Sequence, residues 1–274
     1  MNFNKMCDYL TSRLPIDKIP ITWDSMGYTS ETFNRWATSP AFSGWQDEHD
    51  TEKQTEVIAR LLNFQRGETL LDVCCGYGRH SLVFAEKYGL IVTGIDISPG
   101  LINAAKRFAA EKKLNITFEK KHATELTGNS DFNSVMIADN SLSLIAPEKA
   151  PLVLKKIYKA LKPGGRLFLD LDNKPFNCRH GTYATHWHIY PGGLILQEIY
   201  FHEDISVEVC CDIDFKQDAD TADEFIMFKR IYALDEIKKL LTDNGFKITG
   251  VYGGWDLTPL EEKSRKMILT GIKQ

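Results

Sequence analysis

The chain has 274 residues, 43% of them apolar, and a formal net charge of −4. This length suits one large α/β domain, or a domain that carries an insertion. The acidic balance argues against nucleic acid as the main partner, because dedicated nucleic-acid-binding domains are usually basic. No apolar run reaches the length of a membrane-spanning helix, and the first residues lack the apolar core of a signal peptide. The six cysteines follow no disulfide or zinc-finger spacing, so we expect reduced thiols and a cytoplasmic protein.

Residues 1–48 are predicted to form a cap of short helices over one edge of the core. Prolines interrupt this segment, and no long periodic helix stands out in it. Its tryptophans give it too much aromatic content for a disordered tail. The main domain is predicted over 49–274 and begins with a helical pattern over 49–64.

The next element is a strand over 69–75 that runs into a helix over 79–88 through two glycines. Gly76 and Gly78 permit backbone angles that other residues avoid, and they leave room for a ligand. Asp72 lies inside the strand, where a buried carboxylate needs hydrogen bonds. We expect Asp72 to hold the glycine loop through backbone N–H groups.

A second carboxylate, Asp96, ends the next predicted strand (91–97), twenty residues after Gly76. A carboxylate at that place can accept hydrogen bonds from ribose hydroxyls. The pattern therefore predicts a nucleoside pocket at the carboxyl edge of a parallel sheet. A dinucleotide-binding loop usually has a third glycine, where this chain has Ser81. The fixed anion Asp72 is unfavourable for a pyrophosphate and suits a ligand that carries an ammonium group.

The pattern continues as alternating helices and strands. Ser98 and Pro99 are a good N-cap and first-turn residue for a helix that we expect to end near Lys113. A buried strand over 132–139 ends in Asp139 and Asn140, at the place where the strand order of such sheets reverses and ligands bind. The remaining predicted elements of this part are a strand over 115–119, a helix over 147–161, a turn over 162–165 and a strand over 166–171.

Strict alternation over 205–215 then predicts a half-buried antiparallel strand, with neighbours at 194–201 and 224–232. We expect the whole β insertion, 177–232, to roof the active site and to set the choice of substrate. After a helix over 235–244, the last two strands (246–255 and 266–272) are separated by only ten residues. A parallel crossover needs a longer connection, so this pair should be antiparallel.

Two histidines in the insertion, His186 and His188, are the candidate catalytic bases. In an extended segment, alternate residues put both imidazoles on one face. A metal site formed with nearby Cys178, His180 and His202 is the rival interpretation. The spacing is not typical of a metal site, so we predict none.

The strand with Asp72, the Cys-Gly-x-Gly-Arg-His loop and the reversed final hairpin resemble the class I S-adenosylmethionine-dependent methyltransferases, and within them the small-molecule group. The resemblance implies a doubly wound, mostly parallel seven-stranded sheet with an antiparallel C-terminal hairpin. It also implies that the N-terminal segment closes over the cofactor, where Tyr28 and Trp36 are the aromatic residues of most interest. The implied cofactor contacts are Asp72, Gly76, Gly78, Asp96 and Asp139, with backbone groups of Cys74, Ile97, Ala123 and Asn140. His122 stands where this class often has an acidic adenine contact, and the Ala123 N–H is expected to serve instead.

The resemblance predicts an enzyme that moves a methyl group from S-adenosylmethionine to N or O of a small molecule. A base is needed only if the acceptor arrives protonated. One alternative is an NAD(P)-dependent oxidoreductase, which Asp72, Ser81 and the C-terminal hairpin disfavour. The other alternative is a non-catalytic S-adenosylmethionine-binding domain.

Overall fold

The computed structural model of the protein describes residues 3–21, 23, 33–34, 51–179 and 181–274. Tyr28 and Trp36 of the predicted cap, and His180 of the rival metal site, lie outside these residues. Within the described residues, no helix is both long enough and apolar enough to cross a membrane. The division into cap, main domain and insertion stays a prediction.

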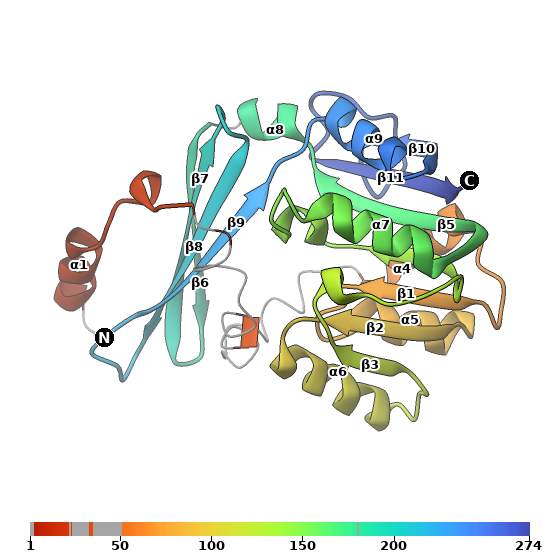
Figure 1. Ribbon diagram of the computed structural model, residues 1–274. Coiled ribbons are helices and arrows are strands. Elements are labelled where there is room, and N and C mark those ends of the chain that lie inside the picture. Colours follow the sequence, from red (N-terminus) through yellow and green to blue (C-terminus); the bar gives the residue numbers. More distant parts are fainter. Residues whose placement is uncertain (1–2, 22, 24–32, 35–50, 180) are drawn as a thin grey trace.

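A seven-stranded sheet forms the larger part of the structure (Figure 1). Its strand order is β10-β11-β5-β4-β1-β2-β3. The strands are β1 (Thr69–Val73), β2 (Ile91–Asp96), β3 (Thr117–Lys120), β4 (Phe132–Ile137), β5 (Leu161–Asp172), β10 (Phe246–Tyr252) and β11 (Lys266–Lys273). Strands β1 to β5 pair in parallel, and β11 pairs antiparallel with both β5 and β10. The predicted sheet and its reversed final hairpin are confirmed.

Helices cover both faces of this sheet because successive strand residues point to opposite sides. Leu71 and Val135 pack against α7 (Ala150–Ala160) and α9 (Leu234–Asp243). Their neighbours in sequence, Leu70 and Met136, pack instead with α4 (Thr51–Leu62) and α5 (Arg79–Tyr88). The next helix, α6 (Pro99–Glu111), packs beside α5 on β3. Its predicted cap is confirmed, since the Ser98 hydroxyl accepts a hydrogen bond of 3.2 Å from the Leu101 N–H.

The predicted turn over 162–165 lies within β5 rather than before it. Leu161 already pairs with Phe132, and the register then shifts so that Arg166 pairs with Ser134. The intervening residues form a bulge, in which Gly164 has a φ of +71°. A glycine with a positive φ is therefore present as predicted, but the strand begins earlier than predicted.

A second, four-stranded antiparallel sheet follows β5 and the short helix α8 (Lys174–Arg179). Its strands, in spatial order, are β6 (Tyr183–Tyr190), β7 (Gly193–His202), β8 (Val207–Lys216) and β9 (Asp223–Arg230). Figure 1 shows this sheet standing beside the larger one, with α1 (Phe3–Ser12) on its far side.

The prediction that the alternating strand is half-buried is wrong, because every residue of β8 from Val207 to Phe215 is buried. Val209, Cys211 and Ile213 pack on one face against α1 and the turn η1 (Ile16–Lys18). The other face carries Glu208, Cys210 and Asp212, which line a cavity. The polar face is thus turned toward a ligand site rather than toward open solvent.

Candidate active site

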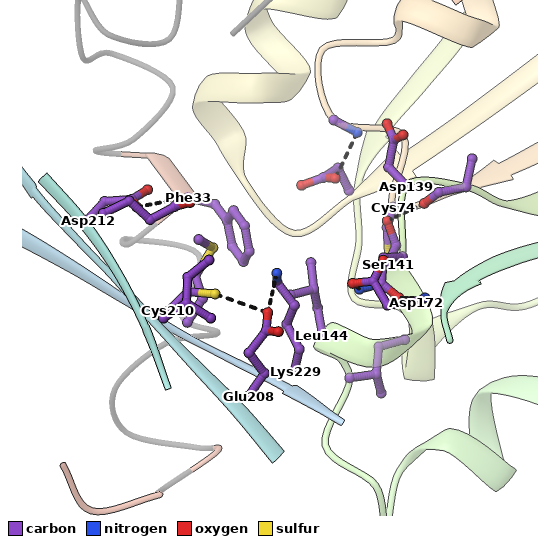
Figure 2. Close-up of a pocket in the computed structure, with 18 of the residues that line it drawn as sticks. Phe33, Cys74, Asp139, Ser141, Leu144, Asp172, Glu208, Cys210, Asp212 and Lys229 are labelled. Carbon is purple, nitrogen blue, oxygen red and sulfur yellow. Dashed lines mark hydrogen bonds and ion pairs between the residues drawn. The ribbon is translucent and has the colours of Figure 1, made fainter. Parts of the chain in front are cut away.

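A cavity of about 1140 Å³ lies between the carboxyl ends of the parallel strands and the inner face of the four-stranded sheet. Its wall on the sheet side includes the glycine loop after β1 and the residues that end β2, β4 and β5. Its opposite wall comes from β6, β7, β8 and β9. Figure 2 shows Asp139 and Asp172 on one side of this space and Glu208, Cys210 and Asp212 on the other, with the ring of Phe33 between them.

The two glycines of the loop after β1 have different structural roles. Both adopt left-handed angles, with φ of +56° at Gly76 and +79° at Gly78. A Cβ placed on Gly76 would meet nothing within 4 Å, so this position leaves room beside the cavity. A Cβ on Gly78 would lie 2.7 Å from the ring of Phe118, so this glycine is required by packing.

Asp96, rather than Asp72, holds the glycine loop. One Asp96 carboxylate oxygen accepts from the Gly76 N–H at 2.9 Å, and the other accepts from the Ser98 N–H at 2.9 Å. Burial raises the pKa of this carboxyl, and these backbone hydrogen bonds oppose the rise. Each oxygen can accept more than one hydrogen bond, so Asp96 retains capacity for ligand hydroxyls.

The predicted role of Asp72 as the holder of the loop is therefore corrected. Its carboxylate accepts a hydrogen bond of 2.7 Å from the Ser81 hydroxyl in the first turn of α5. The side chain thus bonds to the helix rather than to the loop, because Ser81 brings a donor directly to it. Burial raises the pKa of Asp72 to about 7, and the Ser81 hydrogen bond only partly offsets the effect.

Arg79 is a site residue that sequence reasoning missed. Its guanidinium contacts both Asp139 carboxylate oxygens, at 2.5 and 2.6 Å, and also donates to Thr51 and Gln54 of α4. The available signal was an arginine directly after the glycine loop together with a carboxylate at the end of β4. Asp139 is consequently held in place by an ion pair while its side chain still lines the cavity.

Asn140, expected to act through its backbone, uses its side chain to join the ends of β4 and β5. Its amide donates to the Asp172 carboxylate at 2.7 Å, and its carbonyl oxygen accepts from the Asp172 N–H at 3.0 Å. Lys266 of β11 pairs with Asp172 at 2.9 Å. Burial alone would raise the pKa of Asp172, but the charges of Lys266 and Lys229 hold it below its ordinary value.

Of the other predicted cofactor contacts, Cys74, Ile97 and Ala123 line the cavity, whereas Gly78 does not. Ala123 begins the one-turn helix η2 (Ala123–Glu125), and His122 is the N-cap of that turn. The His122 ring contacts the Thr124 hydroxyl at 2.5 Å, so this histidine supports the turn beside Ala123.

His186 and His188 lie in β6, so the predicted extended segment is confirmed. Both line the cavity, and they pair across to Gln197 and Ile195 of β7. Further along the same wall, Lys229 of β9 forms an ion pair of 2.7 Å with Glu208. The Gln197 amide donates to Asp212 at 2.8 Å.

Comparisons with known proteins agree with this geometry. Residues 70–165 match the model of a methyltransferase domain family. A putative methyltransferase of Geobacillus sp. (strain WCH70) is 25% identical over 89% of this chain and 97% of its own length. The ubiquinone biosynthesis O-methyltransferase of Coxiella burnetii is 33% identical over 41% of this chain, which spans 47% of that enzyme.

Solved structures share the fold. An S-adenosylmethionine-dependent methyltransferase from Clostridium acetobutylicum has a TM-score of 0.72 at 16% identity, over 83% of this chain and 94% of its own. The sugar N-methyltransferase of a Streptoalloteichus species has a TM-score of 0.67 at 18% identity, over 96% of this chain and 99% of its own.

The parallel sheet with a reversed final hairpin is the architecture of these methyltransferase structures. Residues 70–165 thus form a methyltransferase domain, and the fold is that of the S-adenosylmethionine-dependent methyltransferases. The methyltransferase domain supports the predicted cofactor, S-adenosylmethionine, over the NAD(P) of the oxidoreductase alternative.

Proposed function

We propose that this enzyme methylates N or O of a small-molecule acceptor held between the glycine loop and the β6–β9 sheet. The observation that carries the proposal is a cavity of about 1140 Å³ that is lined by both parts. Small-molecule sites commonly occupy roughly 300–1,000 Å³, so this volume has room for a nucleoside cofactor and a modest acceptor together. The net charge of −4 supports a small molecule over a nucleic acid as the partner.

The residues around the glycine loop fit S-adenosylmethionine. The open position at Gly76 supports close approach of the ligand to the backbone of Cys74 and Gly76. We assign the ribose hydroxyls to Asp96, which lines the cavity at the end of β2. The adenine is assigned to the side with Ile97 and the Ala123 N–H.

The ammonium end of the cofactor is assigned to the opposite side of the loop. Asp72, Asp139 and Asn140 all line the cavity there, and two of the three are carboxylates. The Arg79 ion pair supports this role for Asp139, because a fixed carboxylate loses little freedom on binding. Burial raises the pKa of Asp72, and a bound ammonium group would favour its ionised form and so its negative charge beneath the loop.

When bound, S-adenosylmethionine supplies a methyl group that its sulfonium charge already activates. The chain's own task is to orient the acceptor and to exclude water. If the acceptor arrives protonated, His186 or His188 is proposed to accept the proton, since both line the acceptor side of the cavity. We propose that the enzyme works in the cytoplasm, which its six free cysteines support.

Calorimetric titration of the purified protein with S-adenosylmethionine, S-adenosylhomocysteine and NADH tests the cofactor site. Binding of the first two at micromolar concentrations, with no heat from NADH, is the expected result. Transfer of labelled methyl to a panel of amines, phenols and carboxylic acids then tests the reaction. Transfer to RNA with none to the panel would overturn the proposal of a small-molecule acceptor.

A further inference from the structure

We propose that Asp212 and Gln197 bind the methyl acceptor and select one that carries an ammonium group. This inference rests on the proposed function, because it concerns the acceptor side of the same cavity. It assigns a substrate class, amines, and a specificity-determining residue, Asp212.

The residues form a row across three neighbouring strands. His186 of β6 pairs in register with Gln197 of β7, and Gln197 pairs with Asp212 of β8. All three line the cavity, as do the apolar Ile195, Ile199 and Met227 around them. The row is therefore a polar strip on an apolar wall, the arrangement that orients a small ligand.

Asp212 and Glu208 are two carboxylates of this wall, and they differ in their partners. The Asp212 side chain is buried, with 7% exposure, and one oxygen accepts from Gln197 at 2.8 Å. Among the described residues, Asp212 forms no ion pair. Lys229, the nearby cation, is paired with Glu208 at 2.7 Å. Burial raises the pKa of Asp212, and Gln197 and Lys229 offset this only in part.

A buried carboxylate of this kind is best satisfied by a ligand that brings both positive charge and N–H donors. An ammonium group brings both. A hydroxyl brings a donor without the charge, and a carboxylate ligand would be repelled by Asp212 and Glu208. An ammonium must lose one proton before its nitrogen can act as a nucleophile, and His186 in the same row can accept that proton.

The test is calorimetric titration of the full chain, saturated with S-adenosylhomocysteine, with matched probes. These are cyclohexylammonium and benzylammonium ions, compared with cyclohexanol and benzyl alcohol. We expect the ammonium ions to bind the unsubstituted protein at least tenfold more tightly than the alcohols. Asp212→Asn should weaken ammonium binding by about ten- to hundredfold, because it removes the charge and keeps the shape. Asp223→Asn is the matched control, since Asp223 pairs with Lys216 outside the cavity lining.

Equal binding of alcohols and ammonium ions would overturn the inference, as would no ammonium binding or unchanged binding in Asp212→Asn. The comparison of probes on the unsubstituted protein does not depend on how any variant folds. The affinity for S-adenosylhomocysteine, measured in the same series, reports on the proposed function separately. If the unsubstituted protein bound the ammonium ions but not S-adenosylhomocysteine, the proposed function would be refuted and the amine-binding site would remain supported.

Discussion

Replacement of Asp96 by asparagine should both loosen the glycine loop and weaken cofactor binding. The Asp96 carboxylate accepts from two backbone N–H groups, each at 2.9 Å. An asparagine keeps one acceptor oxygen but turns an NH₂ group toward the second donor. One charge-assisted hydrogen bond is lost and a buried N–H is left without its acceptor, at a cost of roughly 1.5–3 kcal/mol in the free energy of unfolding.

The same change removes half of the acceptor capacity that we assign to the ribose hydroxyls. Affinity for S-adenosylhomocysteine should therefore fall by about ten- to hundredfold. Urea unfolding measures the first effect, and calorimetric titration measures the second. Asp131→Asn is a suitable control, because Asp131 also accepts from a backbone N–H, that of Asn129 at 3.0 Å, but lies away from the cavity. Unchanged stability and unchanged affinity in Asp96→Asn would refute the reasoning, and a loss of stability alone would remove Asp96 from the cofactor site.

Three further predictions concern other parts of the site. The folded-state pKa of Asp72 is about 7, above its ordinary 3.8, so its contribution to stability is fully present below pH 3.8 and is lost as the pH rises to 7. Between these two pH values, Asp72 lowers the free energy of unfolding by up to about 1.4 kcal/mol per pH unit. Asp72→Asn should remove this pH dependence, and an unaltered slope would contradict the raised pKa of Asp72. Gly78→Ala should lower the free energy of unfolding, measured with urea, by at least about 2 kcal/mol. The added methyl group would lie 2.7 Å from Phe118, at a backbone φ of +79°. An unchanged free energy of unfolding would contradict the packing role of Gly78. A His186→Ala, His188→Ala double variant should lower kcat by about 10²-fold or more on an amine acceptor, with affinity for S-adenosylhomocysteine intact, and normal turnover would end the hypothesis of a histidine base.

Local chemistry in the sequence was sufficient for much of the fold. The two glycines after a buried strand, the Ser98 cap and the short connection before the last strand each act over a few residues, and each prediction was confirmed. The carboxyl edge of the sheet was also located correctly, because the ends of parallel strands meet there whatever the side chains do.

Long-range contacts account for the rest. Arg79 and Asp139 are 60 residues apart in the chain, and the sequence carries no local sign of their ion pair. Asp96 holds the loop in place of Asp72, because the role of each buried carboxylate depends on which donor it reaches. The burial of the apolar face of β8 depends on α1 and η1, which come from the N-terminal part of the chain.

Neighbouring residues along β8 face different surroundings, because alternate side chains point to opposite faces of the strand. Substitutions at adjacent positions therefore have different consequences. Substitutions at positions 208, 210 and 212 would change the proposed acceptor site. Positions 209, 211 and 213 must stay apolar, because they pack against α1. A one-residue insertion at the start of β8 would exchange the two sets, because the strand has a period of two. Carboxylates would then be buried against α1, and aliphatic side chains would occupy the proposed acceptor site. The range of acceptors can therefore diverge readily by substitution, but not by slippage of this strand.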